Sequence, residues 1–326
     1  MNFLIQQTLI YAIPLMIVAL AGVFAERSGI INIALDGIMV FGSFVGALTV
    51  YFMQQAGALA DSPQAMFIVA MLVSAAAGAI FSLLLSFSAV NLKADQTIGG
   101  TALNMLAPAI SLLVIKIITD GQDKLPMPNS SLGYIIHNPE MPDFFKGFFD
   151  KMYISTYIVI GLFILLSIFL YKTKTGLRLR ACGEHPQAAD SVGINVHKMR
   201  YLGTTISGAL AGLGGYIYIS TIAAGTVEGT VAGMGFLALA IMIFGNWKPV
   251  GIALGSLLFG FLKCLGAAYA SLDINGDGIF ALKELDLPLY FYNMIPFIVV
   301  LVVLAFTSKK SRAPKAEGIP YDKGQR

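Results

Sequence analysis

The stretch that decides the fold is YKTKTGLRLRACGEHPQAADSVGINVHKMR, residues 171–200. It is rich in lysine and arginine, and it lies between two apolar runs, 152–172 and 200–221. These runs have the length that a helix needs to cross a bilayer, about 20 residues. Short loops rich in basic residues stay on the cytoplasmic side of a membrane. The stretch therefore predicts a cytoplasmic loop, residues 173–199, that joins two transmembrane helices.

The composition extends this membrane prediction to the whole chain. Of its 326 residues, 57% are hydrophobic and 12% are charged, with a mean hydropathy of +0.78, whereas a soluble domain carries about 25% charged residues. Barrel strands would be about half as long as the apolar runs. We expect an all-α polytopic membrane protein with about eight to ten transmembrane helices, drawn from the runs 3–24, 32–53, 65–90, 100–118, 152–172, 200–221, 233–246, 249–270 and 290–307.

A second basic segment sets the expected orientation. The tail 309–326 is also rich in lysine and arginine, and an even number of apolar runs separates it from the first basic loop. Both segments are therefore expected in the cytoplasm, with residues 1–308 forming the transmembrane domain. The loops 119–151 and 271–289 are expected outside, and so is the N-terminus if every run crosses.

Small residues recur within two of the runs, in SAAAGAIFS (74–82) and SGALAGLGG (207–215). Spacings such as Gly208 and Gly212 let helix backbones approach closely in lipid. We interpret these stretches as surfaces for helix packing rather than as a functional site.

Several classes of chemistry are absent from the sequence. It contains no G-x-x-x-x-G-K-[ST] phosphate loop, no H-E-x-x-H and no G-x-S-x-G, so we expect no ATP on this chain. The net charge of +3 is too small to indicate nucleic-acid binding. Cys182 falls in a polar loop and Cys264 in an apolar run, which argues against a disulfide. An ion-coupled secondary transporter needs carboxylates within the membrane, and the runs hold only Asp36, near the start of one.

Asn104 and Lys263 are the candidates for a substrate path, because both are polar and lie within apolar runs. Each has a structural alternative. Asn104 can make a hydrogen bond between helices, and Lys263 can pair with a polar group of another subunit.

The basic loop contains a short predicted helix, PQAADSV, residues 186–192. Glu184 and Pro186 suit a helix start, because proline is tolerated in the first turn and acids favour the positive end. Gly193 suits the helix end. A helix of about two turns is marginal in water, so we expect it to dock into a partner; an incidental turn in a surface loop is the alternative.

The same loop resembles the coupling loop of ABC importer permeases for branched-chain amino acids, simple sugars and nucleosides. Its pattern is met by Gly176, Arg178, Arg180, Ala181, Gly183, Pro186, Ala188, Ala189, Gly193, Ile194 and Asn195. A second block, ERSGIINIALDG (26–37), is similar to the family's E-R-S-G-x-x-N-I-x-x-E/D-G stretch, with Asp36 where relatives commonly have Glu. Further blocks follow in order over nearly the whole chain. Within the family, SGIINIALDGIMVFGSF (28–44) and LPLYFYNMIP (287–296) look most like nucleoside permeases.

The resemblance implies a type II-like ABC importer permease in a bacterial cytoplasmic membrane, with no enzymatic activity of its own. It implies a heterodimer with a second permease, a separate cytoplasmic ABC ATPase, and an extracytoplasmic substrate-binding lipoprotein or periplasmic protein. Nucleosides are the implied substrate, and a simple sugar such as ribose or galactose is the alternative because sugar permeases share most of these blocks. Coupling to the ATPase would involve Glu184, His185, Pro186, Ala188, Ala189 and Gly193.

One further stretch, SLDINGDGIFALKELD at 271–286, matches the EF-hand pattern D-x-[DN]-x-[DN]-G-x5-E. An external loop sees steady calcium, so a weak site there would act as a structural clip between the last two runs; a calcium-gated channel would need its sensor in the cytosol. A metal-free polar turn is the alternative, because Asp, Asn and Gly favour turns. In the loop 273–284, the Ca²⁺ ligands would be Asp273, Asn275, Asp277, Ile279 through its carbonyl, and Glu284.

Overall fold

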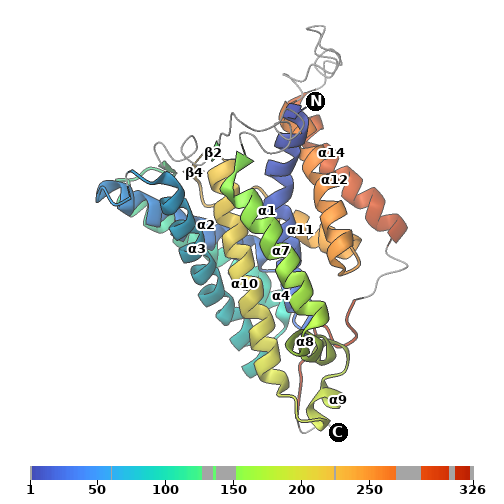
Figure 1. Cartoon of the computed structure of the whole chain (residues 1–326). Helices are drawn as coiled ribbons and strands as arrows, with labels where there is room; N and C mark the ends of the chain where they lie inside the picture. The colour runs from blue at the N-terminus through green and yellow to red at the C-terminus, as the bar shows by residue number, and fades with distance from the viewer. Residues whose placement is uncertain are drawn as a thin grey trace.

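The protein is a bundle of long helices with two short helices and the C-terminus gathered at one end (Figure 1). The computed structural model describes residues 2–59, 61–126, 135–136, 152–223, 225–268, 288–307 and 313–323. Its helices are α1 Asn2–Arg27, α2 Leu35–Gln55, α3 Pro63–Ser86, the π-helical η1 Phe87–Asn91, α4 Gln96–Ile118, α7 Ile154–Lys172, α8 Lys174–Glu184, α9 Pro186–Ser191, α10 Val196–Thr221, α11 Met234–Phe244, α12 Pro249–Ala268 and α14 Leu289–Thr307.

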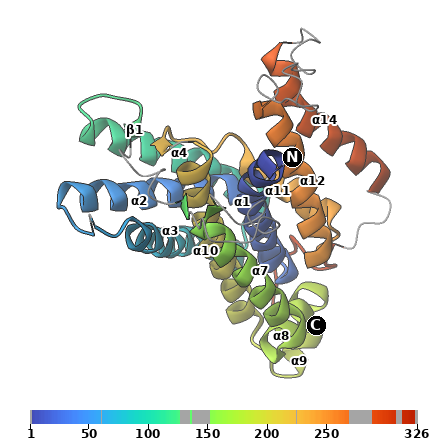
Figure 2. The ribbon, with the colours of Figure 1, turned by 45° about the horizontal axis from the view of Figure 1, so that its top comes forward.

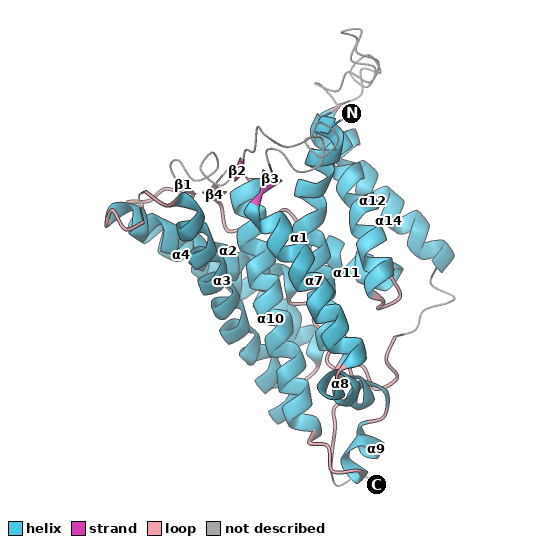
Figure 3. Ribbon diagram, in the orientation of Figure 1, coloured by secondary structure: helices cyan, strands magenta, loops and turns pink. Residues whose placement is uncertain are grey.

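Helices dominate the structure, and the short strands lie at the end opposite to α9 (Figure 3). Strand β1 Leu125–Pro126 pairs antiparallel with β4 Thr226–Val227, and β2 Ile135–Ile136 pairs antiparallel with β3 Met152–Tyr153. Because β1 follows α4 and β4 follows α10, these two helices finish at the same end of the bundle. We call this the strand end, and the end that carries α8 and α9 the α9 end.

Each predicted apolar run contains a helix, which confirms the all-α polytopic fold. Seven of the described helices are long and apolar enough to cross a membrane: α1, α2, α3 with η1, α4, α7, α10 and α12. The remaining two runs form α11, a shorter apolar helix, and α14, an apolar helix of 19 residues. With 11 residues, α11 rises only about 17 Å, roughly half of the hydrocarbon core of a bilayer.

The run 233–246, one of the candidates for a span, forms only the short helix α11. Strand β4 places the start of this segment at the strand end, whereas Trp247, just after α11, donates a hydrogen bond to Glu26 at the α9 end. Residues 228–233 cover the remaining distance without regular structure. Irregular backbone at membrane depth is tolerated where protein surrounds it. The segment as a whole still crosses, so the even number of crossings between the two basic segments is kept.

Helix α10 occupies the middle of the bundle, where it packs against α1, α2 and α3, and Figure 2 shows α12 and α14 on the other side of α1 from α2 and α4. A methyl group on Gly42 of α2 would overlap the backbone of Gly212, and one on Gly78 of α3 would overlap the carbonyl of Gly208. The Ser74 hydroxyl lies 2.8 Å from the Gly42 carbonyl oxygen and 2.6 Å from that of Gly212. The predicted small-residue packing surfaces are therefore present as backbone contacts.

The two basic segments meet at the α9 end. Residues 313–323 of the tail lie against α8, α10 and the connection between α1 and α2. The amide of Ala316 donates a hydrogen bond of 2.9 Å to the Gly183 carbonyl in α8, and Arg200 of α10 donates one of 2.9 Å to the Ile319 carbonyl. This part of the tail is thus built into the fold.

A pair of carboxyl groups joins the tail to α1. The carboxyl groups of Glu317 and Glu26 interact, and two neighbouring carboxyl groups favour a proton on one of them. Burial raises the pKa of Glu317 from 4.5 to about 7, and the interactions with Glu26 and with the charge of Arg27 oppose this rise. The neutral form of the Glu317 carboxyl is therefore favoured in the folded protein up to nearly neutral pH.

Replacing this carboxyl, Glu317→Gln, should flatten the pH dependence of stability. A carboxyl whose pKa rises on folding stabilises the fold below its unfolded pKa and loses that contribution as pH rises through the folded value, here between 4.5 and about 7. Thermal unfolding midpoints of the detergent-solubilised wild type and variant should lie close together at low pH, and the variant should be more stable at high pH, for example about pH 5 and about pH 8.

The matched control is Asp61→Asn, at an exposed carboxylate of the strand end. If the difference between wild type and Glu317→Gln has the same size at both pH values, the carboxyl pair does not contribute to the pH dependence.

Candidate functional site

The loop predicted at 173–199 folds into two helices at the tip of the bundle (Figure 1). At the start of α8, the Thr173 hydroxyl accepts a hydrogen bond of 3.1 Å from the Gly176 amide. At the start of α10, the Asn195 side-chain oxygen accepts one of 2.9 Å from the Lys198 amide. Such caps satisfy the amide groups that the first turn of a helix leaves free. Both borders of the loop are therefore fixed, and α9 lies between them.

Helix α9 covers PQAADS of the predicted helix PQAADSV. Pro186 occupies its first turn. Just after the helix, Gly193 has φ +84°, a conformation that favours glycine and ends the helix. The expectation that Glu184 belongs to the same helix start is wrong, because Glu184 is the last residue of α8. Its carboxylate accepts a hydrogen bond of 3.2 Å from Arg27 at the end of α1. Glu184 thus ties the loop to the transmembrane bundle.

The six predicted coupling residues fall on different sides of the loop. Ala189 is 3% exposed and packs with Cys182, Val196 and Tyr321, and Pro186 is buried as well. These two inward residues hold α9 on the rest of the chain. The outer surface of the tip is made by His185, Gln187, Ala188, Ser191, Val192 and Gly193, all exposed.

A pocket of about 400 Å³ lies beside α9. It combines the basic residues Lys174 and Arg178 with Leu177 and Val192, which are 60% and 74% exposed. This combination suits a partner surface that offers acidic and apolar groups. The sequence marks Lys174 as a basic loop residue and Arg178 as part of the coupling-loop pattern. Neither signal places them beside Val192, because their distance from it depends on the turn between α8 and α9.

Beneath α9 lies a thiol, Cys182, with no exposed surface. Burial raises its pKa to about 11, and the charge of Arg200 opposes the shift. The thiol is therefore protonated at physiological pH, and thiols of this kind are chemically inert. Cys264 is also buried and free.

The side chain of Asn104 is engaged by the backbone of the segment that leads into α2. Its amide nitrogen donates a hydrogen bond of 2.9 Å to the Ile33 carbonyl, and its oxygen accepts one of 2.7 Å from the Gly37 amide. A methyl group on Gly37 would collide with Asn104. The structure thus displays the interhelical hydrogen bond that was the structural alternative for this residue.

Asp36 has a role that the sequence did not reveal. Its carboxylate accepts a hydrogen bond of 2.9 Å from the Gly235 amide in the first turn of α11, where Gly233 has no side chain that can act as a cap. A carboxylate at a helix N-terminus is favoured by the free amide groups and by the helix dipole. An acidic residue at the start of an apolar run was the available signal, but its partner lies 199 residues away.

Lys263 finds an aromatic partner within the described chain. Its ammonium group lies 4.9 Å from the centre of the Phe297 ring, so it links α12 to α14. A cation over an aromatic face is attracted by the ring electrons. The pairing with another subunit, expected as the alternative, is not required to explain this lysine.

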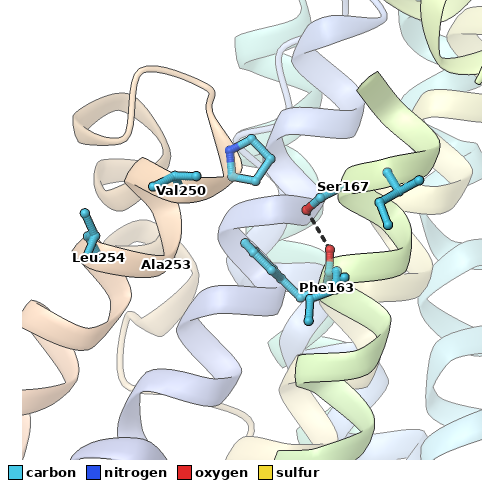
Figure 4. A pocket seen from close by; sticks show the side chains of 8 residues that line it. Phe163, Ser167, Val250, Ala253 and Leu254 are labelled. Atoms are coloured by element: carbon cyan, nitrogen blue, oxygen red, sulfur yellow. Dashed lines mark hydrogen bonds between the residues drawn. The ribbon is translucent and has the colours of Figure 1, made fainter. Parts of the chain in front are cut away.

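An apolar pocket of about 350 Å³ lies between α7 and α12 (Figure 4). Ser167 is the one hydroxyl among its lining residues, and it donates a hydrogen bond of 2.6 Å to the Phe163 carbonyl. A nucleoside or sugar needs several polar partners for its hydroxyl groups. This pocket does not offer them, and its lining residues are Phe163, Ile164, Ser167, Ile168, Pro249, Val250, Ala253 and Leu254.

The predicted calcium loop lies outside the described residues, which resume at residue 288. This applies to all five expected ligands: Asp273, Asn275, Asp277, Ile279 and Glu284. Within the part of the chain that is described, no group of three or more His, Cys, Asp or Glu side chains is placed to hold a metal ion.

Comparisons with known proteins identify the family. Residues 4–304 match the family of the branched-chain amino acid transport system permease component. The guanosine ABC transporter permease protein NupQ of Bacillus subtilis is 41% identical, covering 100% of this chain and 98% of its own. The nucleoside ABC transporter permease protein NupC of Lactococcus lactis subsp. cremoris is 38% identical with the same coverage.

A second Bacillus subtilis protein, the guanosine ABC transporter permease protein NupP, is 25% identical over 80% of this chain and 73% of its own. No solved structure gives a significant match. The match over nearly the whole chain and the apolar helices of the fold agree, and the chain belongs to the family of ABC importer permeases described as the branched-chain amino acid transport system permease component.

Proposed function

We propose that this chain is the permease subunit of an ATP-driven nucleoside importer and that α9 is its contact with a separate ATPase. The observation that carries the proposal is the outer surface of the tip, where Ala188 of α9 and the adjacent Val192 are exposed while Ala189 anchors the helix from below. A surface of small and apolar side chains on a short, firmly held helix suits insertion into a groove of a partner protein.

Nucleosides are the proposed substrate because NupQ and NupC, whose names give guanosine and nucleosides, match over the full length of this chain. NupP and NupQ come from the same organism, and both match this chain. This supports a heterodimer in which the present chain works with a second, unlike permease. A substrate-binding lipoprotein or periplasmic protein would deliver the nucleoside at the strand end, which we place outside the cell.

The α9 end is then cytoplasmic, in keeping with the basic residues that gather there. A push on α9 can reach the bundle through two described connections. Glu184 is bonded to Arg27 at the end of α1, and a methyl group on Gly183 would overlap the Arg27 carbonyl, so α8 and α1 are in backbone contact. Close-packed contacts of this kind move as rigid bodies rather than deforming. ATP binding would bias the permease by favouring one of its two states.

We place the substrate path along the surface that this chain presents to the second permease. Asn104 would shape the path by holding the backbone at Ile33 and Gly37, since both ends of its amide are occupied there. Lys263 would act similarly by fixing α14 through Phe297. Contacts with the base and ribose would come from both permeases.

Ala188→Glu should abolish coupling. The added carboxylate would be buried in the ATPase groove without a partner, which is costly, whereas the isolated permease has room for it on the exposed side of α9. In vesicles with the complete transporter, uptake and substrate-stimulated ATP hydrolysis should both fall by about tenfold or more. Ala58→Glu, an exposed alanine at the strand end, is the matched control. Wild-type uptake by Ala188→Glu would refute the assignment of α9.

The substrate class can be tested by competition. In vesicles with the complete transporter, unlabelled guanosine or adenosine should suppress uptake of labelled guanosine, and ribose or galactose at equal concentration should not. The reason is that a site for a nucleoside derives much of its affinity from the base, which sugars lack. Labelled ribose should not accumulate. If labelled ribose is taken up, and galactose inhibits this uptake while guanosine does not, the chain is a sugar permease.

We also propose that the loop 273–284 binds Ca²⁺ as a structural clip, on the strength of its ligand spacing. At about 10 mM calcium, a site with a dissociation constant of about 1 mM would stabilise the protein by about 1.4 kcal/mol. The thermal unfolding midpoint should rise relative to a chelator control, and Asp273→Ala/Glu284→Ala should lose this rise. A rise that persists in the double variant would locate calcium elsewhere, and no rise in the wild type would exclude the clip.

A further inference from the structure

The C-terminal segment 313–323, which we call the strap, crosses the α9 end and contacts α8, α9, α10 and the connection between α1 and α2. It returns to α8 and α9 although α14 lies on the far side of α1 (Figures 1 and 2). Sequence composition indicated only a basic tail. Its contacts fall into four groups, each with a different element.

The first group joins the strap to α8 and to the connection between α1 and α2. The Ala316 amide donates to the Gly183 carbonyl at 2.9 Å, and the Gly318 amide donates to the Gly29 carbonyl at 3.3 Å. Gly29 and Gly318 both have positive φ, +96° and +75°. A methyl group on Gly318 would meet the Ile31 side chain at 2.7 Å. The strap therefore fits closely against the backbone here.

The second group involves Arg200, which is 1% exposed at the base of α10. Its guanidinium donates a hydrogen bond of 2.9 Å to the Ile319 carbonyl of the strap. Among the described residues, no acidic side chain forms an ion pair with Arg200. A buried charge without polar partners is costly, so the strap carbonyl is a principal partner of this arginine, and the two segments are strongly tied.

The third group lies directly under α9. Tyr321 is 5% exposed and packs with Ala189 of α9, Cys182 of α8 and Val196 of α10. Its ring lies 5.5 Å from that of His197 in an edge-on arrangement. The inner face of α9 carries only small side chains, so the large ring of Tyr321 fills the space between α9 and the bundle.

The fourth group reaches the connection between α3 and α4. Asp322 forms an ion pair of 3.0 Å with Lys93, and both side chains are partly exposed. Asp95, two residues further on, caps α4 by accepting hydrogen bonds from the amides of Thr97 and Ile98. The strap thus spans from the end of α1 to the start of α4.

We propose that the strap is a coupling element of the transporter and that Tyr321 positions α9, so that a push on α9 moves α8, the α1–α2 connection and the start of α4 together. This inference rests on the proposed role of α9. A six-residue helix has few contacts of its own through which force can pass to distant helices. The strap supplies backbone and side-chain contacts to each of them.

Tyr321→Ala should therefore uncouple the transporter. In vesicles with the complete transporter, uptake should fall by about tenfold or more, while ATP hydrolysis should fall by about twofold or less, because the outer face of α9 still reaches the ATPase. Asp61→Ala, at an exposed residue of the strand end outside the strap, is the control. Equal losses of uptake and hydrolysis would make the strap a simple stabilising element and overturn the proposal, and so would unchanged uptake.

A charge exchange tests the same idea at a site where folding is not at risk. Asp322→Lys should lower uptake relative to hydrolysis, and Lys93→Asp/Asp322→Lys should recover at least about half of the loss, since the ion pair is restored in reverse. If Tyr321→Ala fails to insert into the membrane, the charge-exchange variants still test the proposal. Unchanged uptake by Asp322→Lys, or no recovery of uptake by Lys93→Asp/Asp322→Lys, would overturn it.

The buried thiol Cys182 reports on the strap directly. In a Cys264→Ala background, a membrane-permeable maleimide should label Cys182 slowly, and Tyr321→Ala should speed labelling by about tenfold because the ring no longer covers the thiol. Unchanged labelling would show that Tyr321 does not shield α8 and would overturn its positioning role. Failure of the strap proposal can be distinguished from failure of the proposed role of α9, because only the latter would give normal uptake by Ala188→Glu.

Discussion

The structure depends on the backbone contacts that α10 makes with α2 and α3 at glycine. Apolar side chains gain little free energy when they move from lipid into a helix interface, because lipid is equally apolar. Helix association therefore relies on close packing and on hydrogen bonds between helices. Gly212 meets Gly42, Gly208 meets Gly78, and the Ser74 hydroxyl bridges the carbonyls of Gly42 and Gly212. These contacts fix the position of α10 along and around its axis. Everything attached to its ends is positioned as a consequence.

At the α9 end, Asn195 caps the start of α10, and Val196 packs against Ala189 of α9. His197 contacts the ring of Tyr321, and Arg200, one turn further along, donates a hydrogen bond to the strap. The tip is therefore continuous with the most firmly packed helix of the bundle. Close-packed interfaces transmit displacement because they have few alternative arrangements. In the proposed coupling role, a short helix attached to a loosely packed helix would not pass a displacement on to the bundle. Helix α9 instead rests on α8, α10 and the strap at once.

Much of the helical architecture could be predicted from the sequence, because the length of an apolar run indicates a helix without knowledge of its partners. The nine runs became helices, Pro186 and Gly193 bounded α9, and the small residues marked packing surfaces. The division of the loop at His185, the half-length of α11 and the docking of the strap could not be predicted. Each depends on contacts between distant segments, such as Gly235 with Asp36 or Ala316 with Gly183, that involve backbone atoms and leave no local pattern.

Two polar residues in the apolar runs, Asn104 and Asp36, have structural partners in distant segments. An amide or carboxylate at membrane depth is expensive unless it is paired, which makes each one a functional candidate. Here Asn104 and Asp36 are paired with backbone amides, at the starts of α2 and α11 where the helical hydrogen bonds are missing. The irregular segments 28–34 and 228–233 exist because these side chains satisfy the helix starts that follow them. Broken helices in transporters commonly accompany substrate sites, so these two polar residues support the proposed path by making the breaks possible.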